Sequence, residues 1–546
     1  MTEAVCKEKS CYLRSDTKLE LLAFRWYAWP HLVAPLQHAM NMAFRHVPLL
    51  ESYLANPQIH AVTVQDPSML GAPFVDIPPP QSSQARELLL DTTRRGARLI
   101  EVAQAFKELN RRIQAVATGF SLDGEYERLP AALRGVVELV YDTNSHPRIR
   151  LLEELAYLQE ELDDRDGQEV CVSNVRDVDR KFFLTTPRLR KADALDLQMS
   201  FDDPRIDVLA SLRTRALPRQ QIVEKLQLQP EQAALLDNFL TERAPVRLQP
   251  EYAGPGVRVR YFGHACVLVQ SAASAVLMDP LTAWERDGSG QNLTFDDLPD
   301  RIDYAVLSHC HMDHCCPEMI VQLRHRVRQW AVPRNVCGEL ADPSMKLLLR
   351  RLGCANVIVC DPLDRLPLSD GELVSLPFPG EHCGLDIASK QSMAVTICGR
   401  RFLFLVDSDA VDAALYRRLA RIVPRADALF IGMECQGAPL SWFYGPLLGK
   451  ATSRKDDESR RGNASNCARA LQAISHIECG DVYVYAMGNE SWNRYLLGLE
   501  YGEDSIQVTE SDKLVDLCRR TGKRAQRLSC SQELQFARGA APLLSV

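Results

Sequence analysis

Two different patterns of apolar residues divide the chain near residue 245. Before that point the apolar positions recur at three- and four-residue steps, which predicts helices with one buried face. The clearest such helix has an apolar face made of Leu99, Val102, Ala103, Phe106, Leu109, Ile113 and Val116. A second helical stretch is expected around Leu151 to Leu162. We therefore expect residues 1–245 to form a mainly helical α+β domain.

From Val257 the chain changes to short apolar or alternating runs separated by turns, which is typical of β-strands. The runs are Val257–Tyr261, Cys266–Gln270, Ala275–Met278, Tyr304–Leu307, Met393–Ile397, Phe402–Val406 and Ala428–Met433. Helical stretches fall between the later runs. Strands of this number with intervening helices predict two sheets packed face to face with helices outside, an α/β fold over residues 246–546.

Composition narrows the class of protein. The 546 residues are 46% hydrophobic and 25% charged, and the net charge of −7 argues against nucleic acid as a partner. No apolar run reaches the roughly 18 to 20 residues that span a bilayer, and the N-terminus lacks a signal-peptide pattern. The 17 cysteines are odd in number and scattered, as expected of reduced thiols. A cytoplasmic enzyme of two domains that does not bind membranes is expected.

The densest chemistry lies in Ser308-His309-Cys310-His311-Met312-Asp313-His314, directly after the apolar run Tyr304–Leu307. A strand followed by a turn lets His309 and His311 face one metal while Asp313 and His314 face a second. The alternative is a polar turn whose histidines only form hydrogen bonds, but the chain has only 12 histidines in all. Cys310, Cys315 and Cys316 lie within or beside this stretch, yet we expect them to pack in the core because their neighbours already fill the coordination positions.

Several landmarks resemble the metallo-β-lactamase fold. They are Gly263-His264-Ala265-Cys266, the strand that ends in Asp279-Pro280, and the stretch Ser308–His314. The resemblance implies further ligands at later strand ends: a histidine from a Pro-Gly-His turn, a bridging aspartate after a strand, and a late histidine. The fold class implied is an αββα sandwich that follows the N-terminal domain.

Two of these positions have candidates with competitors. Pro379-Gly380-Glu381 stands where the fold has Pro-Gly-His, so Glu381 replaces imidazole by carboxylate. His382 is an alternative, but a slip of one residue in a tight turn points the side chain elsewhere. Asp407 follows Phe402–Val406 and matches the bridging aspartate; Asp409 competes with it, or serves as a supporting residue or a helix cap.

The late histidine is missing. The run Asp481–Tyr485 resembles the strand that carries it, but Ala486-Met487-Gly488-Asn489-Glu490 follows. Glu434 is the best replacement, because it ends an apolar strand at the rim where the other ligands emerge and an ionised carboxylate there is costly unless paired or bound to metal. A rim salt bridge is its alternative role, and His476 is a weaker candidate.

The resulting donors are three imidazoles and four carboxylates: His309, His311, His314, Asp313, Glu381, Asp407 and Glu434. Zinc hydrolases favour nitrogen- and sulfur-rich shells, whereas oxygen-rich shells suit iron or manganese. This set, together with a long N-terminal domain, resembles the diiron β-hydroxylases of nonribosomal peptide biosynthesis. The resemblance implies hydroxylation at Cβ of an amino acid held as a thioester on the phosphopantetheine arm of a carrier domain.

The resemblance also implies a role for each ligand. His309, His311 and Glu381 would hold the first iron, Asp313, His314 and Glu434 the second, and Asp407 would bridge them. Two Fe ions in an oxo- or peroxo-bridged centre would use O2 and two electrons from an external electron-transfer partner. A homodimer is expected. The chief alternative is a dinuclear zinc or manganese hydrolase that resembles lactonases, and an inactive scaffold is a further one.

Other features stay open at this stage. Trp26, Tyr27 and Trp29 are expected to be core residues, with an interface as the alternative. Ser441-Trp442-Phe443-Tyr444 could line a substrate pocket or simply pack. Arg188-Leu189-Arg190-Lys191 and Arg460-Arg461 could dock an acidic carrier domain or its arm, although solvated surface is the usual fate of such runs. The segment Lys450–Asn463 is predicted to be a mobile loop.

Overall fold

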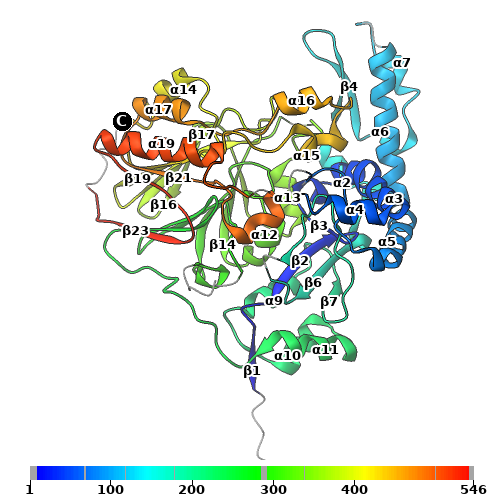
Figure 1. Ribbon diagram of the computed structural model, residues 1–546, viewed down its shortest axis with the longest axis horizontal. Helices are drawn as coiled ribbons and strands as arrows, with labels where there is room; N and C mark the ends of the chain where they lie inside the picture. Colours follow the sequence, from blue (N-terminus) through cyan, green and yellow to red (C-terminus); the bar gives the residue numbers. More distant parts are fainter. Residues whose placement is uncertain are drawn as a thin grey trace, which may run out of the picture.

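A computed structural model describes residues 9–66, 69, 71–116, 119–176, 179–284, 292–336, 338–498 and 500–539. In Figure 1 the N-terminal part, coloured from blue through cyan to green, lies beside a larger part coloured green to red. None of the helices in the described ranges is both long and apolar enough to cross a membrane.

The N-terminal part is a mixed helical and β structure. A four-stranded sheet has the order β3 (Trp26–Tyr27), β2 (Lys18–Ala23), β6 (Gln168–Ser173) and β7 (Leu195–Gln198). Smaller sheets join β8 (Leu217–Pro218), β1 (Ser10–Leu13) and β9 (Leu240–Thr241), and pair β4 (Val137–Tyr141) with β5 (Pro147–Leu151). The helices are α1 (Pro30–Val33), α2 (Pro35–Asn41), α3 (Val47–Ala55), α4 (Pro57–Thr63), α5 (Ser82–Arg95), α6 (Ala97–Val116), α7 (Asp123–Tyr126), α8 (Glu153–Ala156), α9 (Arg205–Ser211), α10 (Arg219–Leu226) and α11 (Pro230–Leu236).

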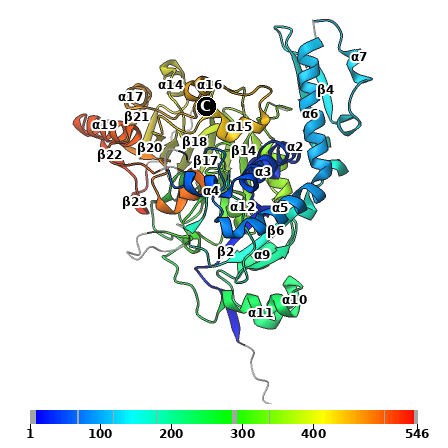
Figure 2. The same ribbon diagram turned by 45° about the vertical axis from the view of Figure 1, so that its right-hand side comes forward.

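Helix α6 confirms the strongest helical prediction. All the residues of its expected apolar face except the last are buried, and Val116 is exposed because it ends the helix beyond the packed part. Figure 2 shows this helix standing at the edge of the molecule beside β4. The expectation of one helix over Leu151–Leu162 is wrong. Strand β5 ends at Leu151, α8 is one turn long, and a 3₁₀ turn follows at Glu160–Leu162.

The C-terminal part contains two seven-stranded sheets. The first has the order β15 (Val357–Cys360), β14 (Val327–Pro333), β13 (Ile302–Val306), β12 (Ala275–Met278), β11 (Cys266–Gln270), β10 (Val257–Gly263) and β23 (Gln532–Phe536). The second has the order β16 (Arg365–Leu368), β17 (Gly371–Pro377), β18 (Gln391–Ile397), β19 (Arg400–Phe404), β20 (Arg425–Gly432), β21 (Glu478–Tyr485) and β22 (Arg524–Arg527). The runs predicted as strands are therefore all strands, with small differences at their ends.

Each sheet ends in four parallel strands, β12 to β15 in the first and β19 to β22 in the second. Val276, Phe402 and Phe404 belong to the buried cluster that fills the space between the sheets. Ligands gather at the carboxyl ends of parallel strands, where loops replace the hydrogen-bonded ladder. Six of the seven predicted metal ligands follow β13, β19 and β20 and thus emerge at such ends, whereas Glu381 follows the antiparallel strand β17.

The two sheets have different outer coverings. The second sheet is covered by α14 (Ala413–Leu419), α17 (Cys467–His476) and α19 (Ile506–Arg520), which lie together at one edge of Figure 1. The first sheet packs against α12 (Pro317–Leu323), α13 (Met345–Arg351) and the N-terminal part, which share one hydrophobic cluster. The N-terminal part therefore completes the outer layer of the sandwich. The proposed boundary at residues 245 and 246 lies in the connection between β9 and β10.

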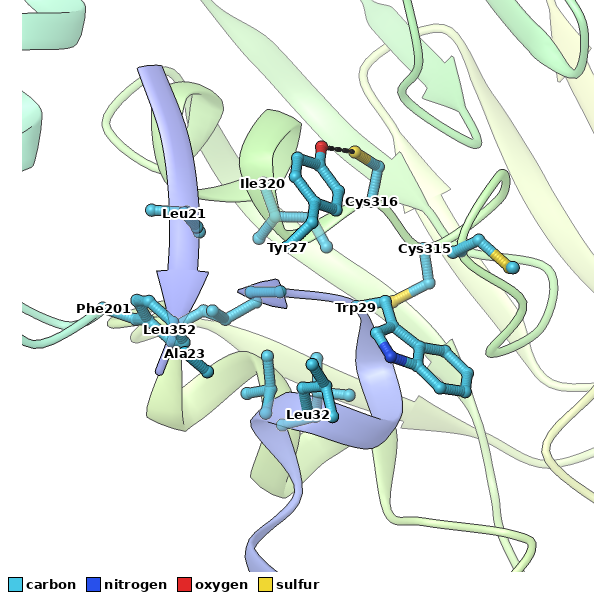
Figure 3. Packing of buried hydrophobic residues seen from close by; sticks show 14 of the residues in the cluster. Leu21, Ala23, Tyr27, Trp29, Leu32, Phe201, Cys315, Cys316, Ile320 and Leu352 are labelled. Carbon is cyan, nitrogen blue, oxygen red and sulfur yellow. Dashed lines mark hydrogen bonds between the residues drawn. The ribbon is translucent and has the colours of Figure 1, made fainter. Parts of the chain in front are cut away.

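Trp26, Tyr27 and Trp29 lie in this shared core, with exposed fractions of 0%, 1% and 2%. Figure 3 shows Tyr27 reaching toward Cys316, with its hydroxyl oxygen 3.8 Å from the sulfur. The expectation that these aromatics are core residues is confirmed, and the surface that they bury belongs to the same chain.

Candidate metal centre

The stretch after β13 is anchored by Asp279, which follows the neighbouring strand β12. Asp279 accepts hydrogen bonds from the backbone N–H and the hydroxyl of Ser308, both at 2.7 Å. The Nδ1 of His314 lies 2.9 Å from Asp279, and the Nδ1 of His309 lies 2.9 Å from the Ser308 hydroxyl. The Nε2 atoms of both histidines are buried without a hydrogen-bond partner. When one ring nitrogen of a histidine is held by such a hydrogen bond, the orientation of the ring is fixed and the other nitrogen is directed toward the metal.

The first group of possible ligands joins His309, His311 and Glu381, whose ligand atoms all lie within 4.8 Å of one another. The Nδ1 of His311 is 2.8 Å from the Oε1 of Glu381. The turn after β17 makes this possible, because Gly380 and Glu381 both adopt positive φ values, +91° and +70°. A left-handed non-glycine residue is strained, and such strain is common at functional sites. Burial raises the pKa of the Glu381 carboxyl.

His382 does not belong to that group. Its Nδ1 lies 2.8 Å from the hydroxyl of Tyr444, and its Nε2 is buried without a partner. The ring of His382 packs against those of His311 and His309, with centroids 4.5 and 5.4 Å apart, but no nitrogen of His382 joins a group of close ligand atoms in the described ranges. The geometry supports Glu381 over His382 as the ligand.

Asp407 belongs to the group of His309, His314 and Asp407. Its Oδ2 lies 2.9 Å from the Nε2 of His314 and 3.8 Å from that of His309, while its Oδ1 is buried without a hydrogen bond. The adjacent strand comes very close, since a Cβ at Gly432 would stand 2.6 Å from the Asp407 Oδ1. Glycine is therefore required there. Asp409 lies beside Gly380 but outside the groups of close ligand atoms in the described ranges, and its Oδ1 accepts the backbone N–H of Val411 at 3.1 Å.

A third group contains His264, Asp313 and His314. The Nε2 of His264 lies 2.9 Å from the Oδ2 of Asp313. His264 has a φ of +48° in the turn between β10 and β11, and its backbone N–H donates a hydrogen bond to the Oε1 of Glu490 at 2.8 Å. We did not predict a site role for His264. Its place in the Gly263–Cys266 turn, one of the landmarks of the fold, was the signal that could have suggested one.

Glu434 follows β20 but lies outside all three groups. Its carboxylate accepts a hydrogen bond from the hydroxyl of Tyr501. Burial raises the pKa of Glu434 well above its usual range, and the carboxylates of Glu381, Asp313 and Asp407 add to the effect. Glu434 therefore faces the same cluster of charges. His476 ends α17 before β21, at the opposite end of the parallel strands from Glu434, since Arg425 pairs with Glu478 and Gly432 with Tyr485.

The electrostatics of the cluster fit a bound cation. Burial, together with the neighbouring imidazoles, lowers the pKa of His309 well below its usual range, so that its nitrogen lone pair is free. In the described ranges, none of the four carboxylates forms a salt bridge with lysine or arginine; they are Asp313, Glu381, Asp407 and Glu434. Buried charges without such partners require compensation. Orphaned nitrogens, an orphaned carboxylate oxygen and excess negative charge together suit metal ions.

The cysteines of this region pack without facing the site. Cys310, Cys315 and Cys316 are all buried, and burial raises the pKa of Cys316 to about 12. A protonated thiol is a poor metal ligand. The three groups in the described part of the chain contain only histidine and carboxylate donors, as the sequence had led us to expect.

The aromatic run after Glu434 lies directly on the site. In α15 (Leu440–Tyr444), Phe443 stacks on the ring of His311 with centroids 4.7 Å apart, and the Tyr444 hydroxyl lies 3.0 Å from the Nε2 of His311. Trp442 instead lines a cavity of about 450 Å³ with Phe74 of the N-terminal part. Pocket wall and packing residue were the two alternatives for this run, and the structure contains both.

The folded sandwich and its cluster define a metallo-β-lactamase-type domain with a dinuclear, carboxylate-rich centre. A family described as the diiron non-haem β-hydroxylase N-terminal domain matches residues 12–245, and the β-lactamase superfamily domain matches residues 258–365. The chain is 33% identical over 534 residues to the 4-amino-L-phenylalanyl-[CmlP-peptidyl-carrier-protein] 3-hydroxylase of Streptomyces venezuelae, covering 96% of this chain and 99% of that one.

Comparison with solved structures supports the same family. The crystal structure of CmlA, a diiron β-hydroxylase from Streptomyces venezuelae, superposes with a TM-score of 0.89 at 33% identity, covering 97% of this chain and all 100% of that one. A glutamate-to-aspartate variant of the CmlA β-hydroxylase gives a TM-score of 0.87 at 32% identity, covering 96% of this chain and 100% of that one. The chain belongs to the diiron non-haem β-hydroxylases, and it is an enzyme of the metallo-β-lactamase fold.

Proposed function

We propose that this enzyme hydroxylates the Cβ atom of an amino acid held as a thioester on a carrier domain of a nonribosomal peptide synthetase. One atom of O2 enters the Cβ–H bond, and the other leaves as water with two protons and two electrons from an external electron-transfer protein. The observation that carries the proposal is the place of Glu381 beside His311, where a hydrolase of this fold has imidazole. It makes the donor set rich in oxygen, as iron requires.

The ligand assignment is part of the proposal. His309, His311 and Glu381 would hold the first iron and Asp313, His314 and Glu434 the second, and Asp407 would be a ligand shared by both. Six of these seven residues, all except Glu434, occur in the groups of mutually close ligand atoms, and Asp313 and His314 share their group with His264. Glu434 rests on its shared charge environment with Glu381, Asp313 and Asp407.

When bound, the two irons supply the one-electron steps by which dioxygen becomes reactive. The protein itself holds the ligands and excludes water. Asp279 and Ser308 orient His309 and His314 from behind, and Tyr444 does the same for His311. The Phe443 ring covers His311 on one face. No protein nucleophile is needed for insertion into a C–H bond.

The partners follow from the reaction. The carrier domain is supported by the Streptomyces venezuelae relative, whose name states a carrier-bound amino acid as its substrate. The electron donor, a homodimeric state and a cytoplasmic location remain predictions. The side chain of the amino acid also remains to be identified.

Elemental analysis and the optical spectrum of the oxidised protein, purified from iron- and zinc-replete cells, test the proposal. About two irons per chain and charge-transfer absorption in the visible range are expected. Incubation with aminoacyl carrier domains, O2 and a reductant should then add one oxygen atom, detected by mass spectrometry with ¹⁸O2. Two zinc or manganese ions without visible absorption, together with lactone hydrolysis, would instead establish the hydrolase.

A further inference from the structure

A cleft of about 400 Å³ opens beside Glu381, and its charged lining is mainly basic. Lys390, Arg460, Arg461 and Arg469 line it, as do the acidic residues Asp409 and Glu381. Arg460 and Arg461 belong to the segment that follows α16 (Arg454–Ser459), and Arg469 belongs to the first turn of α17. The cleft therefore lies between a proposed iron ligand and a group of half-buried cations.

Two of these guanidinium groups are held in place with their outer nitrogens free. The Nε of Arg460 donates to the carbonyl of Cys383 at 2.8 Å, and the Nε of Arg461 donates to that of Gly437 at 2.7 Å. Within the described ranges, their Nη atoms have no protein acceptor, and the Arg469 side chain has no hydrogen bond or salt bridge. Guanidinium groups fixed at Nε lose little freedom when they bind an anion through the terminal nitrogens.

The segment that carries these residues is itself anchored. Predicted as a mobile loop, Lys450–Asn463 instead contains α16, which starts at a capping box on Ser453. The N–H of Gly462 donates to Ala438, and the N–H of Gly437 donates to Gly462. A Cβ at Gly462 would stand 3.1 Å from the Oε1 of Glu381, so glycine lets this segment approach the proposed ligand closely.

The other basic run of the sequence differs in its pairing. Arg188 lies 3.2 Å from Glu20, and Arg190 lies 3.0 Å from Glu169 and 2.8 Å from Asp196. Its positive charge is largely neutralised within the protein. Of the two basic runs considered for the carrier, Arg460-Arg461 is the one whose arginines form no salt bridge with an acidic side chain in the described ranges.

We infer that this cleft binds the phosphate of the phosphopantetheine arm, with Arg461 and Arg469 as its main contacts. The inference rests on the proposed function, since the arm is what carries the amino acid to Glu381. Arginine binds phosphate oxygens through paired, charge-assisted hydrogen bonds. The cleft volume also falls in the usual range for small-ligand sites. The carboxylates of Asp409 and Glu381 disfavour an anion next to them, so the phosphate is expected on the arginine side.

Binding of two molecules that differ only in the phosphate tests this inference. The affinity of the full-length protein for 4′-phosphopantetheine and for pantetheine is measured by calorimetry or ligand-detected NMR. The phosphorylated molecule should bind about tenfold more tightly, the usual effect of a charge-assisted contact. Arg469→Ala, which removes no hydrogen bond of the fold, and Arg461→Ala should each remove most of the difference and leave pantetheine binding unchanged.

Arg190→Ala is the matched control, because it removes the same charge from the paired run and should change neither affinity. Equal affinity for the two molecules in the unmodified protein would overturn the inference. So would an effect of Arg190→Ala as large as that of Arg469→Ala, or competition by inorganic phosphate at the same concentration as 4′-phosphopantetheine. The last result would indicate a general anion site.

The carrier domain itself provides a second test. A holo carrier domain should bind more tightly than its apo form, and Arg469→Ala should reduce that difference. If Arg469→Ala instead slowed reduction by an acidic redox protein and left both binding differences intact, the cleft would be a docking site for the electron donor. These binding measurements need neither iron nor turnover, so failure of the hydroxylase proposal would be seen separately in the metal analysis.

Discussion

Among the buried clusters of charge in the described ranges, two differ clearly in balance. At the junction of the N-terminal part and the sandwich, Arg180 lies 3.1 Å from Glu20 and 2.6 Å from Glu318, and Arg188 lies 3.2 Å from Glu20. Two cations thus face two carboxylates. At the candidate metal centre none of the four carboxylates has a lysine or arginine partner in the described ranges: three lie beside imidazoles, and Glu434 accepts a hydrogen bond from Tyr501. A balanced cluster can be stable by itself, whereas the unbalanced one needs cations from outside.

The pKa values follow this division only for Glu20 and Glu434. Burial alone would raise the pKa of Glu20, but Arg188 and Arg180 outweigh it and lower that pKa below its usual value. Glu434 is buried among other carboxylates instead, and its pKa is raised. The direction of the shift is not a general rule, because Glu318 at the junction has a raised pKa and Asp313 at the candidate metal centre has a lowered one. The lack of a lysine or arginine partner is what distinguishes the carboxylates of the candidate metal centre from those of the junction in the described ranges.

The largest effect on stability is expected from Arg180→Ala. This change leaves Glu20 and Glu318 buried without their main partner, and breaking a buried pair from one side costs about 3–5 kcal/mol. Urea unfolding of the metal-free protein should show the loss in the free energy of unfolding. Arg190→Ala is the control, since its side chain is 60% exposed and such pairs contribute at most about 1 kcal/mol. A similar small loss for both variants would contradict the proposed balance at the junction.

Iron should stabilise the folded protein only through the candidate metal centre, and not through the charge cluster at the junction. Ferrous iron at about a thousand times its dissociation constant is expected to raise the free energy of unfolding by about 4 kcal/mol. Asp407→Ala, which removes the proposed bridge, should abolish this increase, and Arg180→Ala should retain it. Anaerobic unfolding curves with and without iron measure both. An iron-dependent increase that survives in Asp407→Ala would show that the metal is held elsewhere.

The third prediction distinguishes Glu381 from the adjacent His382 as the metal ligand. Glu381→Ala should remove iron from the first position and abolish hydroxylation, because its carboxylate lies 2.8 Å from the Nδ1 of His311. His382→Ala should retain both irons and much of the activity. Iron content by elemental analysis and product by mass spectrometry give the result. The reverse pattern would transfer the ligand role to His382.

The sequence predicted the sandwich and the first ligands well for a physical reason. Strand periodicity and the order His-x-His-x-Asp-His are local, and local spacing fixes which side chains share a strand end. The positions of His264 and Tyr501 are set by contacts between distant segments: His264 reaches Asp313, and Tyr501 reaches Glu434. Such pairs have no local signature. Leu151–Leu162 shows the opposite failure: Leu151 ends the hairpin with β4, and the residues after it form one helical turn and one 3₁₀ turn instead of the single helix that the apolar spacing favoured.

Glu434→Ala tests the least direct ligand. If Glu434 completes the second position, the variant should retain about one iron per chain and an intact fold. His264→Ala is the informative companion, because His264 lies closer to Asp313 than any other imidazole that the structure describes there. Two irons in Glu434→Ala and one in His264→Ala would move the second ligand role to His264. Circular dichroism checks the fold of both variants.

The smallest of the expected effects concerns a residue that orients a ligand. With the Nδ1 of His311 turned toward the metal, its Nε2–H donates to the Tyr444 oxygen, and the Tyr444 hydroxyl donates to the Nδ1 of His382. Tyr444→Phe keeps the ring in place and removes both hydrogen bonds. Loss of such an outer partner usually weakens metal binding about 10- to 100-fold.

Competition with a chelator measures that change in iron affinity, and the optical spectrum of the remaining centre reports a reoriented ligand. Phe443→Leu is the matched control, since it changes packing on the same ring without removing a hydrogen bond. An equal loss of affinity in both variants would assign the effect to packing. A loss confined to Tyr444→Phe would show that the metal centre depends on a neutral hydrogen-bonding residue behind its ligand. An arginine in that place, like those that pair with the carboxylates of the junction, would compete with the metal ions for the carboxylate ligands.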